Sequence, residues 1–151
     1  MENNDIKQKI EDTLNKMSVS FDEVEVLKDD SGNPKFLIKT KESGLLIGYK
    51  GEHFLALNHL IKRMVWKNSK DEMKFSIDIN NYQEENLKGL KSKALSLAEK
   101  VKSSKATLEM EPMSPYERMI IHALFSSDPN ITTESVGENK DRRIVLKYNA
   151  I

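Results

Sequence analysis

Cysteine is absent from the chain, which excludes disulfide bonds, thiolate metal sites and a cysteine nucleophile. Residues 1–10 lack the apolar core of a signal peptide. No apolar run approaches the roughly 20 residues that a membrane-spanning helix needs. From these absences we expect a cytoplasmic protein that is not inserted into a membrane.

A net charge is absent as well, because 24 lysine and arginine residues balance 24 aspartate and glutamate residues. Global charge therefore gives no support to nucleic-acid binding, and any basic binding site must be local. Hydrophobic residues make up 38% of the 151 residues and charged residues 32%, which allows compact cores beneath a solvated surface. This length fits one domain of usual size or two small ones.

The N-terminal half opens with the hydrophobic patterns of a helix and a β-hairpin. Apolar residues recur at helical spacing over residues 5–17. Residues 21–28 and 35–41 then mostly alternate between apolar and polar, on either side of residues 29–34, which are rich in turn formers. These patterns predict one amphipathic helix followed by two paired strands.

Helical spacing returns over residues 44–67 and is interrupted near its start by the sequence Gly-Tyr-Lys-Gly at residues 48–51. Two helices are therefore expected to flank a glycine turn. Residues 74–79 alternate again, which predicts a third strand. The predicted order of this half is α-β-β-α-α-β.

Residues 82–104 form the longest helical pattern, which predicts a helix that connects two domains. Its apolar stripe could serve as a coiled-coil dimer seam, but it spans only about two heptads, which favours packing within the chain. The patterns that follow predict a short strand at 107–110, a helix at 115–125, and strands at 131–136 and 142–148.

The Gly-Tyr-Lys-Gly turn is the first motif that points to a ligand. Its glycines let the backbone adopt unusual dihedral angles and come close to another molecule, and the helix that follows offers N–H groups and its positive dipole end to an anion. A sugar-phosphate backbone fits such a site. Alone, the turn is more often a structural helix junction, but here it follows a hairpin and precedes an amphipathic helix and a closing strand. That is the order of a type II KH domain.

Residues 44–66 resemble the KH signature, in which a Gly-x-x-Gly loop holds about four nucleotides against an apolar groove. The resemblance implies that the loop holds phosphates and that residues of the preceding helix and the second strand line or support the groove. The RNA-binding residues it implies in this half are Ile47, Gly48, Tyr49, Lys50, Gly51, Leu37, Ile38, Lys39 and Lys41. For Lys39 and Lys41, exposed hairpin lysines that do not contact RNA are an equally good interpretation.

The second motif begins at Ser114, where the start of a helix is well defined. Ser114 can cap the helix, Pro115 suits its first position, and Glu117 completes a capping box. Arg118 and His122 are four residues apart and therefore share one face of this helix. Alone, such a pair is usually an ordinary surface feature.

The sequence Ser-Pro-Tyr-Glu-Arg followed by Ile-Ile-His and a β-rich tail resembles the R-3-H domain, named for an arginine and a histidine separated by three residues. That domain is associated with single-stranded nucleic acid. The nucleic-acid-binding residues that the resemblance implies are Arg118, His122, Arg142, Arg143 and Lys147. The last three would supply phosphate contacts beside the Arg–His pair. Paired arginines on a terminal strand are also often simply exposed.

A type II KH domain followed by an R-3-H domain resembles the SpoIIIJ-associated family, known as Jag, of bacterial RNA-binding proteins. The resemblance extends from the first helix to about Tyr148. It implies an α+β fold with a type II KH domain at residues 1–81, a connecting helix at 82–105 and a small α/β R-3-H domain at 106–151.

By this resemblance the chain binds single-stranded RNA and acts in post-transcriptional control, linked to cell elongation, division or sporulation. A separate small KH protein, or a second copy of the chain in a homodimer, is a further expected partner. Many members carry an additional N-terminal domain and linker, which we expect this chain to lack, so membrane-associated or septal roles tied to that segment are not carried over. Met119 stands where an additional arginine is common.

Two other classes of function compete with RNA binding. A ribonuclease is disfavoured because His53 and His59 do not share a helical face well, His122 has no evident nucleophile beside it, and no set of residues has the spacing of a familiar metal site. The sequence therefore predicts no enzyme, catalytic residue, metal, cofactor or small-molecule substrate. A protein-interaction scaffold that dimerises or docks through the KH-like surface is the second alternative, and zero net charge favours it.

Overall fold

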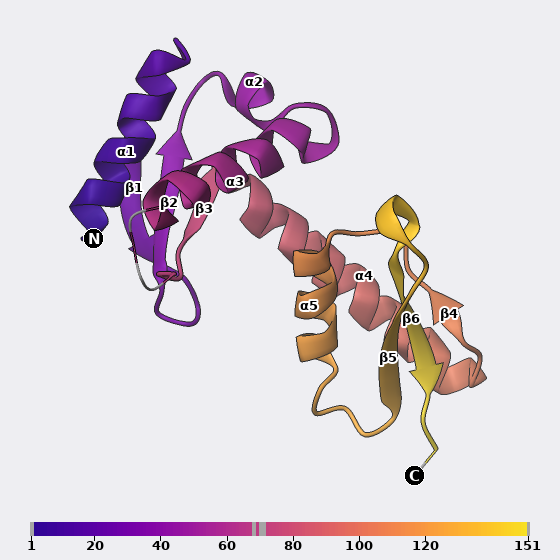
Figure 1. Ribbon diagram of the computed structural model, residues 1–151. Helices are drawn as coiled ribbons and strands as arrows, with labels where there is room; N and C mark the ends of the chain where they lie inside the picture. The colour runs from indigo at the N-terminus through magenta and orange to yellow at the C-terminus, as the bar shows by residue number, and fades with distance from the viewer. Residues whose placement is uncertain (1, 68, 70–71, 151) are drawn as a thin grey trace. The chain divides into compact units, whose positions relative to one another are not determined.

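The protein consists of two compact units divided between Glu84 and Glu85, as a computed structural model of residues 2–67, 69 and 72–150 shows (Figure 1). Each unit has its own hydrophobic core. The fold is a mixture of helices and antiparallel and parallel strands, so the predicted α+β class is confirmed.

The first unit has the element order that the hydrophobic patterns predict. Its elements are α1 (Asn3–Lys16), β1 (Glu23–Lys28), β2 (Pro34–Lys39), α2 (Ser43–Ile47), a 3₁₀ turn η1 (Tyr49–Gly51), α3 (Glu52–Trp66) and β3 (Ser76–Ile79). The sheet order is β1-β2-β3, with β1 and β2 antiparallel and β2 and β3 parallel. The alternation of β2 places Phe36 and Ile38 on the face that packs against the helices, and Lys35, Leu37 and Lys39 on the other face.

The first core forms where one face of the sheet meets one stripe of each long helix. From α1 it takes Ile6, Ile10 and Leu14, and from α3 it takes apolar residues three or four positions apart, Phe54, Leu57, Ile61 and Val65. This packing fixes α3 on the sheet. The Gly-Tyr-Lys-Gly turn is thereby held at the N-terminal end of α3.

Helix α4 (Tyr82–Ser104) has the bounds of the helical pattern at residues 82–104. Its buried residues are Ala94, Ala98 and Val101, and all three belong to the second core, so α4 is a structural part of the second unit as well. No helix in residues 2–67, 69 and 72–150 is both long and apolar enough to cross a membrane.

The second unit adds a three-stranded sheet and one helix to α4. Its further elements are β4 (Leu108–Glu109), α5 (Pro115–Leu124), β5 (Ile131–Val136), a 3₁₀ turn η2 (Asn139–Asp141) and β6 (Arg143–Tyr148). The sheet order is β4-β6-β5, and both pairings are antiparallel. Ile144 and Leu146 of β6 meet Ile121 of α5 in the core, so the inner face of this sheet is the face that α5 covers.

Candidate nucleic-acid interface

The turn between α2 and α3 has a backbone that few residues other than glycine adopt. Gly48 and Gly51 have φ angles of 72° and 77°, and Lys50 between them has 53°. A Cβ atom on Gly48 would lie 2.5 Å from Cγ of His53, and one on Gly51 would lie 2.7 Å from the Tyr82 hydroxyl. Both glycines are therefore required by dihedral angle and by space.

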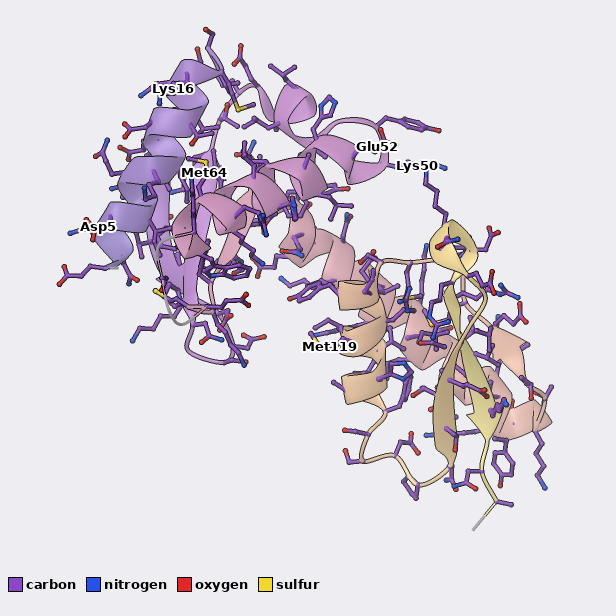
Figure 2. The ribbon with its side chains drawn as sticks, viewed as in Figure 1. Asp5, Lys16, Lys50, Glu52, Met64 and Met119 are labelled. Carbon is purple, nitrogen blue, oxygen red and sulfur yellow. The ribbon has the colours of Figure 1, made fainter. Side chains whose placement is uncertain are left out.

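The two residues between these glycines are exposed to solvent. Tyr49 is 75% exposed, and the Nζ atom of Lys50 lies 5.5 Å from the centre of the Tyr49 ring. Lys50 is labelled in Figure 2. An aromatic ring beside an ammonium group can stack on a base while the charge contacts a phosphate. Glu52 follows at the first turn of α3 and is also exposed, so the loop carries one acid beside its one lysine.

The predicted groove residues differ in what they can contact. Ile38 is fully buried in the core and can only support a binding surface from below, and Leu37 is 5% exposed on the opposite face of the sheet. Ile47 is half-buried against the core, next to the loop. Lys41 is exposed just after β2.

Lys39 lies on the sheet face opposite to α2 and α3, and two carboxylates hold it there. Its Nζ atom is 2.9 Å from Oε1 of Glu23 and 2.9 Å from Oε2 of Glu25. Hydrogen bonds and charge attraction from these two groups raise the pKa of Lys39 above its ordinary value. The structure therefore does not bring Lys39 to the loop, and its charge is already neutralised.

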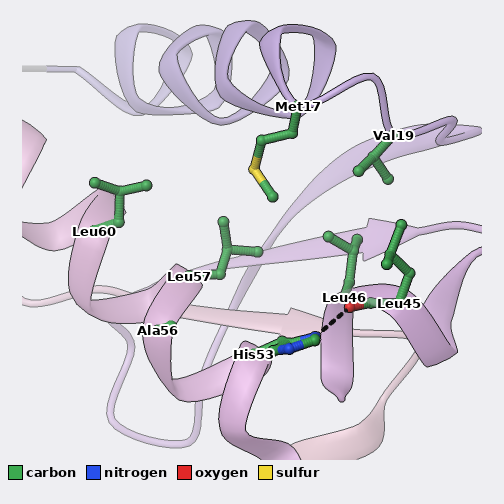
Figure 3. Close-up of a pocket in the computed structure, with 8 residues that line it drawn as sticks. All are labelled: Met17, Val19, Leu45, Leu46, His53, Ala56, Leu57 and Leu60. Carbon is green, nitrogen blue, oxygen red and sulfur yellow. Dashed lines mark hydrogen bonds between the residues drawn. The ribbon is translucent and has the colours of Figure 1, made fainter.

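An apolar pocket of about 370 Å³ lies between the end of α1 and the pair α2 and α3 (Figure 3). Its lining residues are Met17, Val19, Leu45, Leu46, His53, Ala56, Leu57 and Leu60. The Nδ1 atom of His53 lies 2.8 Å from the backbone oxygen of Leu45 and so ties the start of α3 to α2. His53 thereby supports the fold of the loop.

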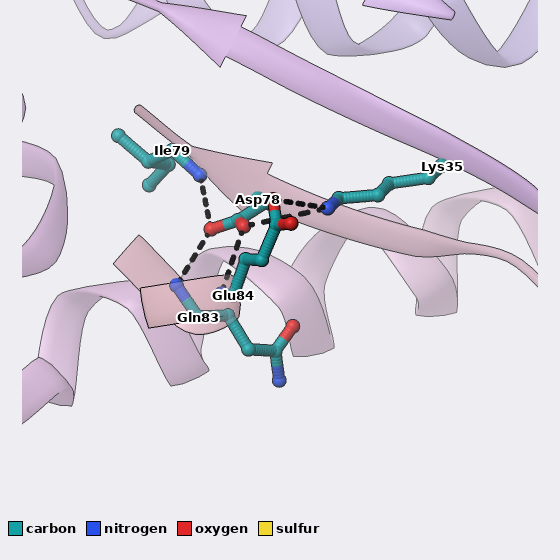
Figure 4. A network of polar contacts seen from close by, with 5 residues as sticks. All are labelled: Lys35, Asp78, Ile79, Gln83 and Glu84. Atoms are coloured by element: carbon teal, nitrogen blue, oxygen red, sulfur yellow. Dashed lines mark hydrogen bonds and ion pairs between the residues drawn. The ribbon is translucent and has the colours of Figure 1, made fainter. Parts of the chain in front are cut away.

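The loop is supported from behind by the junction between β3 and α4. Asp78 is only 1% exposed, and its carboxylate lies 3.8 Å from Nζ of Lys35. The same carboxylate accepts hydrogen bonds from the backbone amides of Ile79, Gln83 and Glu84 at 2.8, 2.9 and 3.2 Å (Figure 4). It thereby satisfies amides in the first turn of α4 and fixes where that helix begins.

Tyr82 is the first residue of α4, and its ring packs against Phe54 of α3 with 5.3 Å between the ring centres. This contact places the Tyr82 hydroxyl directly behind Gly51. The buried Asp78 and the Tyr82 ring together position the second glycine of the loop.

In the second unit, α5 begins as the sequence predicts. The Glu117 amide donates to Oγ of Ser114, and the Ser114 amide donates to Oε1 of Glu117, both at 3.2 Å, so the predicted capping box is confirmed. Arg118 donates from Nη1 to the backbone oxygen of Met113 at 3.0 Å. The Met113 amide donates to the backbone oxygen of Arg142 at 3.1 Å, which links the segments that carry the two arginines.

His122 is held by two hydroxyl groups of β5. Its Nδ1 atom is 2.7 Å from Oγ1 of Thr133, and its Nε2 atom is 3.0 Å from Oγ of Ser135. Sequence reasoning alone does not identify these two residues. The alternation of β5 could have indicated them. It places Thr133 and Ser135 on the inner face of the strand with Ile131, where polar residues are unexpected.

The remaining cations predicted in this unit lie on the other face of its sheet. Arg143 and Lys147 alternate with the core residues of β6 and so point away from His122. Arg143 Nε lies 2.9 Å from Oε2 of Glu109, which raises the arginine pKa, and Lys147 pairs with Glu134, whose pKa it lowers. The structure therefore groups Arg118, His122 and the Arg142 backbone, and separates Arg143 and Lys147 from them.

No group of three or more histidine, aspartate or glutamate side chains in the described part of the chain could hold a metal ion.

Comparison with known proteins identifies a domain and several relatives. Residues 89–148 match the family model of the R-3-H domain, the domain expected from the second motif. The chain is 35% identical over 130 residues to an RNA-binding protein KhpB of Clostridium symbiosum, covering 86% of this chain and 56% of that protein. It is 30% identical to the RNA-binding protein KhpB of Bacillus subtilis, covering 76% and 56%, and 31% identical to that of Streptococcus pneumoniae, covering 72% and 33%. The chain thus spans about half the length, or less, of these curated relatives.

Proposed function

The chain contains an R-3-H domain and is homologous to proteins named RNA-binding protein KhpB, and from this premise we propose that it binds single-stranded RNA without cutting or modifying it. The observation that carries the proposal is the match to the R-3-H domain, because the Arg118 and His122 pair lies within it. The name of these relatives, RNA-binding protein, indicates the same kind of ligand.

The first unit is proposed to be a type II KH domain that holds the RNA backbone at its Gly-Tyr-Lys-Gly loop. The element order, the two glycines with positive φ angles and the exposed Tyr49 and Lys50 support this assignment. On the same proposal the chain is a member of the SpoIIIJ-associated (Jag) family and acts in bacterial post-transcriptional control. A separate small KH protein or a second copy of the chain is then a further partner.

The loop is tested by replacing Tyr49 and Lys50 together with aspartate. Two carboxylates there would repel phosphates, and because both side chains are exposed the fold should be unaffected. We expect the double variant to lose most of its affinity for a fluorescein-labelled single-stranded oligonucleotide, measured by anisotropy at fixed salt. The parent should bind the single strand more tightly than a duplex of the same sequence.

A matched control makes the same charge change elsewhere in the unit. Leu27 and Lys28 lie at the end of β1 and are exposed, so Leu27→Asp with Lys28→Asp should leave affinity close to that of the parent. Equal binding by the loop variant and the parent would contradict the role of the loop. Recovery of the oligonucleotide on a gel, with and without divalent metal, tests the ribonuclease alternative, and shortened products would overturn the non-enzymatic proposal.

A further inference from the structure

Both ring nitrogens of His122 are occupied within the protein, at 2.7 and 3.0 Å from the hydroxyls of Thr133 and Ser135. A side chain held in this way has no nitrogen left for direct contact with a phosphate. Thr133 and Ser135 are half-buried residues, and in the described part of the chain neither hydroxyl has a second hydrogen-bond partner. The groups that can meet an anion here are therefore the hydroxyls.

The protonation state of the imidazole decides how many hydroxyl hydrogens point outward. Neutral imidazole has one N–H donor and one acceptor nitrogen, so one hydroxyl accepts from the ring and the other donates its only hydrogen to the ring. One hydroxyl hydrogen is then free. When the ring takes up a proton from solvent, both nitrogens donate, both hydroxyls accept, and both hydroxyl hydrogens become available to an outside acceptor.

We propose that Thr133 and Ser135 contact the RNA phosphate in the R-3-H domain, and that His122 is a positioning residue whose protonation orients both hydroxyls toward that phosphate. The inference rests on the proposed RNA binding and names further residues of the same site. Arg118 lies one turn earlier on the same face of α5 and supplies a permanent charge on that face. The class of ligand is a phosphodiester of a single strand.

On its own helix, the charged residue that shares the face of His122 is Arg118. On β5, Glu134 points to the outer face and pairs with Lys147, and on β6 the inner positions are Ile144, Leu146 and the phenol of Tyr148. The residues that α4 buries in the core are alanines and valine. A bound phosphate supplies a negative charge that favours the protonated ring, so RNA binding and proton uptake strengthen each other.

The test measures the affinity of a labelled single-stranded oligonucleotide at pH 8 and pH 6, in the Tyr49→Asp, Lys50→Asp background so that the second unit carries the binding. In this background we expect affinity to rise about tenfold as pH falls, the contribution of one hydrogen bond to a charged group. Thr133→Val and Ser135→Ala each remove one hydroxyl. Each should lower affinity at pH 6 by about tenfold and flatten the pH response.

The neighbouring residue provides a matched control. Thr132 is exposed on the outer face of the same strand, so Thr132→Val should keep both affinity and pH response. Thr133→Ser and Ser135→Thr keep a hydroxyl at each site and should restore parental behaviour. Thermal unfolding of each variant distinguishes loss of contact from loss of fold.

Three results would overturn the inference. If Thr133→Val with Ser135→Ala keeps affinity and pH response, the hydroxyls are structural. If His122→Gln alone flattens the response while the hydroxyl variants keep it, the histidine contacts phosphate itself. If the protein with an intact loop binds no RNA at either pH, the proposed function fails, and the inference fails with it.

Discussion

Residues 44, 48 and 51 are all glycine in the first unit, but they serve different purposes. Gly51 has a φ angle of 77° and no room for a Cβ atom behind it, whereas a Cβ atom on Gly44 within α2 would meet nothing within 4 Å. We expect Gly51→Ala to lower the free energy of unfolding by about 1–2 kcal/mol. Gly44→Ala should raise it by about 0.5–1 kcal/mol, because alanine restricts the unfolded chain.

Urea unfolding followed by tryptophan fluorescence measures both variants in the same unit, because Trp66 is the only tryptophan in the sequence and lies in the first unit. Equal shifts for the two alanines would contradict the strained geometry of the loop.

At the scale of single residues, the sequence reveals functional candidates whose motif lies within a few positions of the chain. The loop glycines and the Arg118 and His122 pair are recognisable because their meaning depends on spacing within a few positions. Thr133 and Ser135 are 11 and 13 residues from His122, and only the pairing of β5 with the helix reveals the contact. The carboxylate partners of Lys39 and Arg143 lie on other strands and are likewise not evident from local spacing. The sequence therefore offers Lys39 either as an RNA-binding residue or as an exposed hairpin lysine, and Arg143 as a phosphate contact.

At the scale of elements, two helix starts differ in how deeply their caps are buried. Asp78 satisfies three backbone amides from inside the first unit at 1% exposure, while Ser114 caps α5 in a half-buried position. We expect Asp78→Ala to lower the free energy of unfolding by about 3 kcal/mol, since it leaves buried amide donors without an acceptor and leaves Lys35 with Glu84 as its carboxylate partner. Ser114→Ala should cost only about 1 kcal/mol.

The free energy of unfolding of Asp78→Ala is measured by Trp66 fluorescence in urea. That of Ser114→Ala is measured by far-ultraviolet circular dichroism, because Trp66 lies in the first unit. Lys35→Met is the control, because it removes the ion pair and keeps the cap; it should cost clearly less than Asp78→Ala. A cost for Asp78→Ala no larger than that of Ser114→Ala would show that burial does not strengthen this cap.

Element boundaries are predictable wherever side chains mark them. The capping box correctly predicts the start of α5 at Pro115, and the observed end at Leu124 is one residue short of the prediction.

The buried face of α4 is harder to predict. Periodicity gives a stripe of three leucines with Ala94 and Val101. Ala94 and Val101 are buried together with Ala98, which lies outside that stripe, while Leu90 and Leu97 are only partly buried. Hydrophobic spacing identifies a face, but the packing of the sheet decides which part of it is covered.

At the scale of the whole molecule, zero net charge coexists with local cationic groups. Several cations of the two sheets have carboxylate partners, and the Lys102 and Asp128 pair at 2.8 Å adds another, with the Asp128 pKa lowered by Lys102. Among the residues that the structure describes, Lys50 and Arg118 form no such ion pair. Each paired cation and its carboxylate partner contribute no net charge. The charges of Lys50 and Arg118 are not neutralised in this way.

Lys50 in the first unit and Arg118 in the second lead to a prediction about the length of RNA that the molecule binds. On the proposal that the first unit is a KH domain, its loop holds about four nucleotides, so a four-nucleotide oligonucleotide engages one unit at a time. A longer strand held by one unit is presented to the other at high effective concentration, because both units belong to one chain. A longer oligouridine offers more overlapping binding positions, and the apparent affinity rises in proportion to their number. We expect the affinity of the parent to rise by at least about tenfold more than this proportion.

Variants with one unit disabled separate this effect from a longer single site. In Tyr49→Asp with Lys50→Asp, and separately in Arg118→Ala, the second attachment is lost or weakened, so affinity should rise with length only in proportion to the number of sites. The Leu27→Asp, Lys28→Asp control should keep the steep dependence of the parent. Using one base throughout removes sequence preference from the comparison. A fixed salt concentration keeps the contribution of each phosphate contact to the affinity constant. The same length dependence in the parent and both disabled variants would mean that the two units do not hold one RNA together.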